Sequence, residues 1–67
     1  MKIFAERVKE LRLAKGLPYA TLAKQLDTSG LTICRWESQQ HDANGYSVVK
    51  IAKYFNVTTD YLLGLED

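Results

Sequence analysis

The sequence is poor in several residue types that would point to particular classes of protein. It has one cysteine, Cys34, and therefore cannot form a disulfide within the chain. An unpaired cysteine is typical of reducing compartments, so we expect a cytoplasmic protein. No apolar run approaches the roughly 18 residues that a membrane span needs. The start carries Lys2, Glu6 and Arg7 in an amphipathic pattern, which is not that of a signal peptide.

Groups of residues that support catalysis are also missing. We find no paired carboxylates, no nucleophile beside a base, no glycine-rich phosphate loop and no metal-ligand spacing. The one histidine, His41, stands alone in a polar stretch, where a solvated side chain is the simplest interpretation. The sequence therefore predicts neither an enzyme nor a cofactor or metal site.

Apolar residues recur with helical spacing, and no alternating run is long enough for a sheet. In the first segment, for example, Phe4, Val8 and Leu11 fall on one face. The pattern predicts an all-α chain that forms a single domain over residues 1–67. Its five helices are expected at about residues 2–15, 18–26, 29–38, 45–55 and 58–63.

Residues that start or stop helices support these boundaries. Proline is tolerated in the first helical turn, so Pro18 marks the start of the second helix. Side chains that can cap an N-terminus precede the third, fourth and fifth helices, at Ser29, Asn44 and Thr58. Residues that tolerate a left-handed backbone follow the first, second, fourth and fifth helices, at Gly16, Asp27, Asn56 and Gly64.

The third predicted helix has an inner and an outer side. At about 100° per residue, Trp36 and Glu37 fall on the same side as Ile33. An inward-facing glutamate needs a partner, because a buried carboxylate is costly unless it is paired. The residues expected to face outward are Leu31, Cys34, Arg35 and Ser38.

Residues 17–37, LPYATLAKQLDTSGLTICRWE, resemble the helix-turn-helix of the phage-repressor, XRE-type family. Further blocks match the family in the expected order, namely ELR at 10–12, IA at 51–52, YFNV at 54–57 and DYLLG at 60–64. The resemblance implies a compact five-helix bundle like the DNA-binding domain of the lambda repressor. It also implies a bacterial or phage transcriptional regulator that binds duplex DNA in a sequence-specific way. A repressor is the kind of regulator expected.

By this resemblance, the first residues of the third helix contact bases in the major groove. Leu31 either meets thymine methyl groups or is an ordinary surface leucine. Arg35 either contacts DNA, as a partner of guanine or phosphate, or is simply solvated. The residues that the resemblance assigns to DNA binding are Tyr19, Thr28, Ser29, Gly30, Leu31, Thr32, Arg35, Ser38, Gln39, Gln40 and Asn44.

Three of these positions have particular alternatives. The family often has glutamine where Tyr19 stands, beside helix amides that suit a phosphate. The Tyr19 hydroxyl would donate to that phosphate, or its ring would cover the small core. Gly30 offers only backbone, so either the DNA approaches closely there or the position recognises nothing. Asn44 either contacts phosphate, as expected of residues 38–40, or only caps a helix.

Two structural expectations also follow from the resemblance. Arg12 and Glu37 match an arginine and a glutamate that pair between the first and third helices. Dimerisation is expected through Tyr61, Leu62, Leu63 and Leu65, although at least two of these should complete the core. A twofold dimer would set its recognition helices about 34 Å apart, on a near-palindromic operator. The end of the chain resembles a domain boundary, so a longer parent with a further C-terminal domain is also expected.

Charge is the main argument against DNA binding. Residues 18–45 hold two basic residues against three acidic ones, and the whole chain has a formal net charge of +1. Affinity for DNA normally rests on a basic surplus, so nonspecific affinity would be low unless Arg7, Lys9 and Lys15 supply cations at the flank. The alternative function is a helix-turn-helix fold that binds another protein and has little affinity for DNA.

Overall fold

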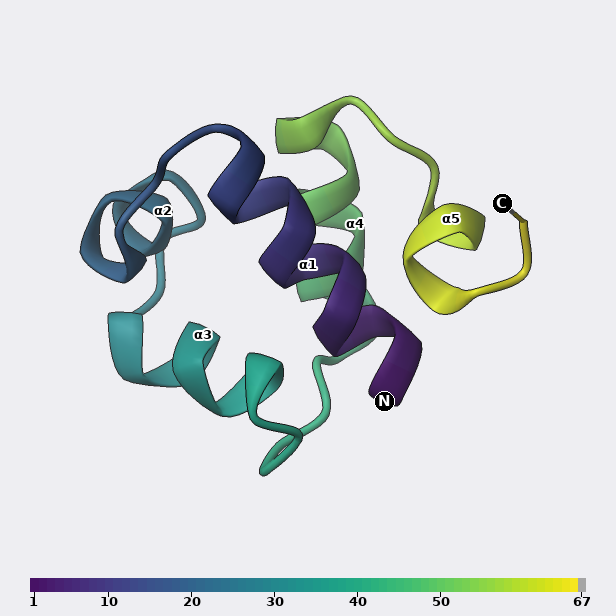
Figure 1. Ribbon diagram of the computed structural model, residues 1–67, viewed down its shortest axis with the longest axis horizontal. Helices are drawn as coiled ribbons and strands as arrows, with labels where there is room; N and C mark the ends of the chain where they lie inside the picture. The colour runs from purple at the N-terminus through teal and green to yellow at the C-terminus, as the bar shows by residue number, and fades with distance from the viewer. Residues whose placement is uncertain (67) are drawn as a thin grey trace.

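The computed structural model describes residues 1–66, and within this range it contains five helices and no strand. The helices are α1 (Lys2–Ala14), α2 (Tyr19–Gln25), α3 (Gly30–Glu37), α4 (Gly45–Phe55) and α5 (Thr59–Leu63). The prediction of an all-α bundle is confirmed. In Figure 1, α1 crosses the middle of the molecule in front of α4. The pair α2 and α3 lies to the left of α1, and α5 lies to the right, next to the C-terminus.

The predicted caps are present at both kinds of helix end. Each of the three predicted N-cap side chains accepts a hydrogen bond from a backbone N–H in the first turn of its helix. These bonds run from Thr32 to Ser29 Oγ (3.1 Å), from Ser47 to Asn44 Oδ1 (2.8 Å) and from Tyr61 to Thr58 Oγ1 (2.9 Å). Positive φ angles follow the other ends, at Gly16 (65°), Asp27 (56°), Asn56 (56°) and Gly64 (80°).

Several helices are one residue shorter at an end than predicted, because the predicted ranges included capping residues. Pro18 shows the reason most clearly. Its φ of −64° suits a helix, but its ψ of 158° is extended, so Pro18 is the N-cap of α2 and Tyr19 is the first helical residue. Lys15, with ψ near 0°, is likewise the C-cap of α1. The predicted range 45–55 matches α4.

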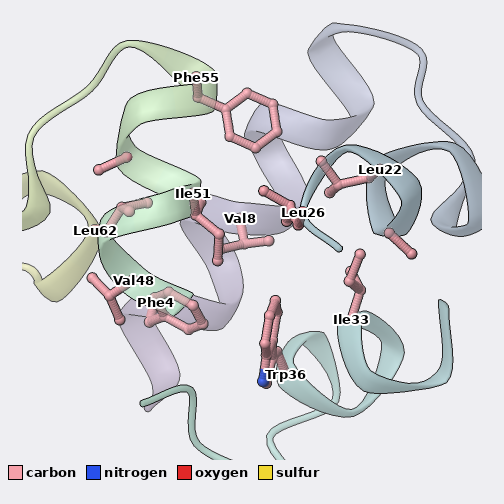
Figure 2. Packing of buried hydrophobic residues seen from close by; sticks show 12 residues of the cluster. Phe4, Val8, Leu22, Leu26, Ile33, Trp36, Val48, Ile51, Phe55 and Leu62 are labelled. Atoms are coloured by element: carbon pink, nitrogen blue, oxygen red, sulfur yellow. The ribbon is translucent and has the colours of Figure 1, made fainter. Parts of the chain in front are cut away.

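One apolar core joins all five helices. Figure 2 shows Ile33 and Trp36 pointing from α3 towards the other helices of the core. The Trp36 ring meets Phe4 of α1 edge-on, with 6.1 Å between ring centroids. The buried apolar side chains of the cluster are Phe4, Val8, Leu22, Ala23, Leu26, Ile33, Trp36, Val48, Ile51, Ala52, Phe55 and Leu62. Because α3 contributes its inner side to this core, its outer side remains free to meet a partner.

The helices of residues 1–66 are too short or too polar to cross a membrane. The same part of the chain contains no group of three or more histidine, cysteine, aspartate or glutamate side chains placed to hold a metal ion.

Candidate nucleic-acid interface

The outer side of α3 carries the residues that the sequence places there. Leu31 is 58% exposed. Arg35 lies one turn further along and is half-buried, and Ser38 follows as the exposed C-cap. Residues four apart on a helix share a face, so Leu31 and Arg35 stand side by side. Cys34 is only half-buried, at the edge of this face.

The N-terminus of α3 is held by its own side chains. Ser29 caps the helix, and its hydroxyl oxygen also lies 2.9 Å from that of Thr32, so the two hydroxyl groups form a hydrogen bond with each other. Gly30 faces α2 rather than solvent. A Cβ placed on it would lie 3.4 Å from Tyr19 Cβ and 3.6 Å from the Ala20 nitrogen. A Cβ at this position would make only ordinary van der Waals contact with α2, so the approach of the two helices does not require a glycine here.

Behind α3, the expected Arg12–Glu37 pair is present and forms a larger cluster. Arg12 Nε donates to Glu37 Oε2 at 2.7 Å, and Nη2 donates to Oε1 at 3.1 Å. Tyr19 donates its hydroxyl to the same Oε1 at 3.1 Å, and Arg12 lies over the Tyr19 ring at 4.2 Å. Arg12 Nη1 also donates to the Leu17 carbonyl at 2.9 Å. The carboxylate of Glu37, on α3, thus accepts hydrogen bonds from side chains of both α1 and α2.

The pKa values of this cluster change in the direction that its contacts dictate. The hydrogen bond to Glu37 raises the pKa of Arg12 above its ordinary value. Burial raises the pKa of Tyr19, and the charge of the Glu37 carboxylate raises it further. Both shifts favour the protonated states, in which Arg12 and Tyr19 act as donors to Glu37.

The polar segment after α3 is exposed, as expected of residues that would contact phosphate. Ser38, Gln39 and Gln40 are all exposed, and Gln39 has a positive φ of 64°. The backbone N–H of Gln40 donates to the Arg35 carbonyl at 2.9 Å, which holds the segment close to α3. The Asn44 side-chain oxygen is already used in capping α4, a contact that favours the structural interpretation of that residue.

A lysine that the sequence analysis overlooked lies beside the turn between α2 and α3. Lys50 of α4 donates to the Leu26 carbonyl, and its ammonium group lies 5.1 Å from the centre of the Tyr46 ring. Together with the exposed Thr28, these side chains line a small pocket. No motif signals this contact, since Lys50 stands within the mainly apolar stretch of α4. The contact ties the middle of α4 to Leu26, the C-cap of α2.

The flanking cations of α1 are turned towards other helices. Arg7 lies 4.2 Å above the Tyr61 ring and donates to the carbonyl oxygens of Tyr61 and Glu66. The Lys15 ammonium group lies 5.3 Å from the centre of the Tyr54 ring on α4. Two of the three cations named as possible compensation thus engage α4, α5 and the segment after it.

The apolar C-terminal end is divided between the core and the surface, and two of its residues complete the core as expected, with Leu62 inside it and Tyr61 packed against it. Leu62 is fully buried in the core, so its side chain is unavailable to a second copy, and its assignment to a dimer interface is wrong. It faces inward because α5 turns that position towards the core. Tyr61 is half-buried under Arg7. Leu63 and Leu65 are exposed, and Leu63 borders two adjoining shallow grooves next to Met1.

Comparisons with known proteins agree with this architecture. The family model described as helix-turn-helix matches residues 8–62. The transcriptional activator BcrR of Enterococcus faecalis is 41% identical over 64 residues, which cover 96% of this chain and 31% of the activator. The transcriptional regulator ImmR of Bacillus subtilis is 29% identical over 62 residues, covering 92% of this chain and 49% of that protein. This chain therefore spans 31% of the length of the first relative and 49% of the length of the second.

A solved structure resembles the whole bundle. The P22 c2 repressor, in a crystal structure with the synthetic operator 9T and Tl⁺, aligns with a TM-score of 0.84 and 26% identity. The alignment covers 92% of this chain and 94% of that one. Repressor protein C2 of Salmonella phage P22 also matches by sequence, with 27% identity over 92% of this chain and 29% of the repressor. On the family match, the five helices and these relatives, the chain belongs to the helix-turn-helix family of phage-repressor, XRE type.

Proposed function

We propose that this chain is the sequence-specific, duplex-DNA-binding domain of a transcriptional regulator that acts in the bacterial cytoplasm. The observation that carries the proposal is the exposed outer side of α3, with Leu31 and Arg35 adjacent, in a fold shared with a repressor solved on its operator. The relatives include an activator and a repressor, and what their names share is the regulation of transcription.

In this proposal α3 lies in the major groove, which is about 12 Å wide and accepts a helix. Arg35 offers a planar pair of donors to O6 and N7 of a guanine, and Leu31 offers an apolar surface to the methyl group of a thymine. In the same proposal Ser38, Gln39 and Gln40 donate to phosphates at the end of the helix. Ser38 then exchanges its 3.4 Å hydrogen bond to the Arg35 carbonyl for one to a phosphate. The bases are then recognised by an apolar contact and a single arginine.

Alanine substitution at the two residues tests this surface. A duplex is first selected from a random pool by the unaltered protein. The double variant Leu31→Ala, Arg35→Ala should then bind it at least about tenfold more weakly, since one good arginine–guanine pair alone discriminates by roughly 1–3 kcal/mol. Leu13→Ala is the matched control, because Leu13 is 56% exposed but belongs to α1. An unchanged affinity in the double variant would remove the basis of the proposal.

A second function is favoured by charge alone. The near-neutral stretch 18–45 suits a protein partner better than a polyanion. Titration of labelled duplex at low and high salt separates the two functions. A protein-binding module shows no binding even at low salt. A DNA-binding domain with one arginine on the outer side of α3 binds its selected duplex with a shallow dependence on salt.

We further propose that the domain binds a near-palindromic operator as a homodimer. The support is an exposed apolar surface where α1, α4 and α5 meet, formed by Ile3, Val49 and Leu63, with Leu63 bordering the grooves on both sides; Leu65, exposed just beyond α5, adds further apolar area near the C-terminus. A twofold axis at this corner would carry two copies of α3 to successive major grooves, about 34 Å apart. Two weakly charged helices that bind together gain affinity that neither has alone.

Leu63→Asp tests the dimer. A charge at the centre of this apolar surface should shift sedimentation towards the monomer and weaken binding to a palindromic duplex. Leu13→Asp serves as the control, since it places the same charge on an exposed leucine of α1. If the Leu63 variant sediments as the unaltered protein does, the interface lies elsewhere.

A further inference from the structure

We infer that Tyr19 is a positioning residue, which sets the place of α3 relative to α2 and thereby controls discrimination between DNA sequences without touching DNA. The inference rests on the proposed function and deepens it. It concerns a residue for which contact with a phosphate is the obvious alternative, because Tyr19 is the first residue of α2.

The hydroxyl group of Tyr19 is already committed. It donates to Glu37 Oε1 at 3.1 Å, and a phenol has only one proton to donate. A phosphate oxygen can only accept, so a phosphate contact through this hydroxyl would first break its bond to Glu37. Glu37 is the last residue of α3, so the bond joins the first residue of α2 to the far end of the recognition helix.

The ring of Tyr19 is held as firmly as its hydroxyl. The Arg12 guanidinium lies over it at 4.2 Å, and Arg12 is itself only 8% exposed and bound to Glu37. A cation over an aromatic face adds attraction to the apolar contact, more so where water is excluded. The ring therefore cannot swing outward without separating from Arg12.

Tyr19 also lies close to the other end of α3. A Cβ on Gly30 would lie 3.4 Å from Tyr19 Cβ, which is ordinary van der Waals contact. Leu31 is the next residue. Tyr19 is thus bonded to the end of α3 through Glu37 and lies next to its start at Gly30. A small shift of Tyr19 would be transmitted to the residues that face the bases.

Specific and nonspecific binding respond differently to such a shift. Contacts to base edges depend on position within fractions of an ångström, as in any preorganised site. Nonspecific affinity comes from charge and carries no sequence information. A residue that positions α3 should therefore alter the ratio of the two affinities. A residue that contacts phosphate should weaken both equally.

Tyr19→Phe tests this distinction, because it keeps the ring on Arg12 and removes only the hydroxyl. The probes are the duplex selected from a random pool and a scrambled duplex of the same length and composition. We expect affinity for the selected duplex to fall by about three- to tenfold, within the usual range for coupling between contacting residues, while the scrambled duplex binds as before. Tyr54→Phe, which removes a hydroxyl from α4, should change neither affinity.

The other results overturn the inference. Equal losses on both duplexes would show that Tyr19 contacts phosphate, and no loss on either would show a purely structural role. Circular dichroism at the assay temperature verifies that the variant is folded. The proposed function fails separately, and visibly, if the unaltered protein selects no sequence from the pool and binds no duplex at low salt.

Discussion

Removing the Glu37 carboxylate should destabilise the domain more than any other single change to its polar side chains. In Glu37→Ala the cluster loses the acceptor of three hydrogen bonds, two from Arg12 and one from Tyr19. The side chains of Arg12 and Glu37 are 10% and 4% exposed, so water cannot replace the carboxylate without rearrangement. The variant therefore leaves a buried guanidinium without its counter-charge.

The size of the loss follows from this geometry. Breaking a buried ion pair by removing one partner typically costs about 3–5 kcal/mol. The Leu17 carbonyl still accepts one N–H of Arg12, which places the loss near 3 kcal/mol, the lower end of that range. A domain of this size has roughly 3–10 kcal/mol of stability in all. The midpoint of thermal unfolding should fall by about 12–24 °C, at roughly 4–8 °C per kcal/mol.

Calorimetry or circular dichroism measures this shift directly. Glu10→Ala is the control, since Glu10 is an exposed acid on α1 whose loss should change stability by less than about 0.5 kcal/mol. Adding Arg12→Leu to Glu37→Ala should recover part of the loss, because it removes the uncompensated charge. A melting temperature within about 2 °C of the unaltered protein would refute the reasoning.

Two further changes test other contacts. Because burial and Glu37 raise the pKa of Tyr19 above its ordinary 10.0, the unfolded chain releases this proton first as pH rises. The stability that the protonated Tyr19 hydroxyl contributes is therefore present below pH 10 and is lost as pH rises through the folded-state pKa. Urea titrations at alkaline pH should show a steeper loss of stability with pH in the unaltered protein than in Tyr19→Phe. Gly64→Ala should cost about 1–2 kcal/mol in thermal unfolding, because Gly64 has a φ of 80° and a Cβ there would lie 2.9 Å from the Ile3 side chain. Gly45→Ala meets open space and should be nearly neutral.

The helices and caps could be predicted because they depend on local chemistry. Ser29 and Asn44 cap helices by bonds that span three residues, and Asn56 adopts a left-handed backbone that its own side chain tolerates. The inner side of α3 followed from spacing alone, with Ile33 and Trp36 buried as expected. Features that depend on residues no more than three apart along the chain could therefore be predicted from the sequence.

Contacts between residues that are distant along the chain could be predicted less well from the sequence. The Arg12–Glu37 pair was expected only from family resemblance, and the hydroxyl of Tyr19 had no sequence signal that assigned it to Glu37. Lys50 was overlooked because its partner is a backbone carbonyl, which every residue has. Leu62 and Leu63 are adjacent and have identical side chains, so only the orientation of α5 decides which of them enters the core.

The low charge and the buried cluster have a common consequence for recognition. A DNA-binding surface rich in lysine holds the duplex by long-range attraction, which tolerates errors in position. In the proposed interface the base contacts rest on Leu31 and Arg35, so such attraction is small and the contacts are short-range. The affinity of the interface then depends on how rigidly α3 is held, and Arg12, Tyr19 and Glu37 hold it from behind. For this domain, substitutions in that interior cluster should affect operator binding more than a moderate change in salt does.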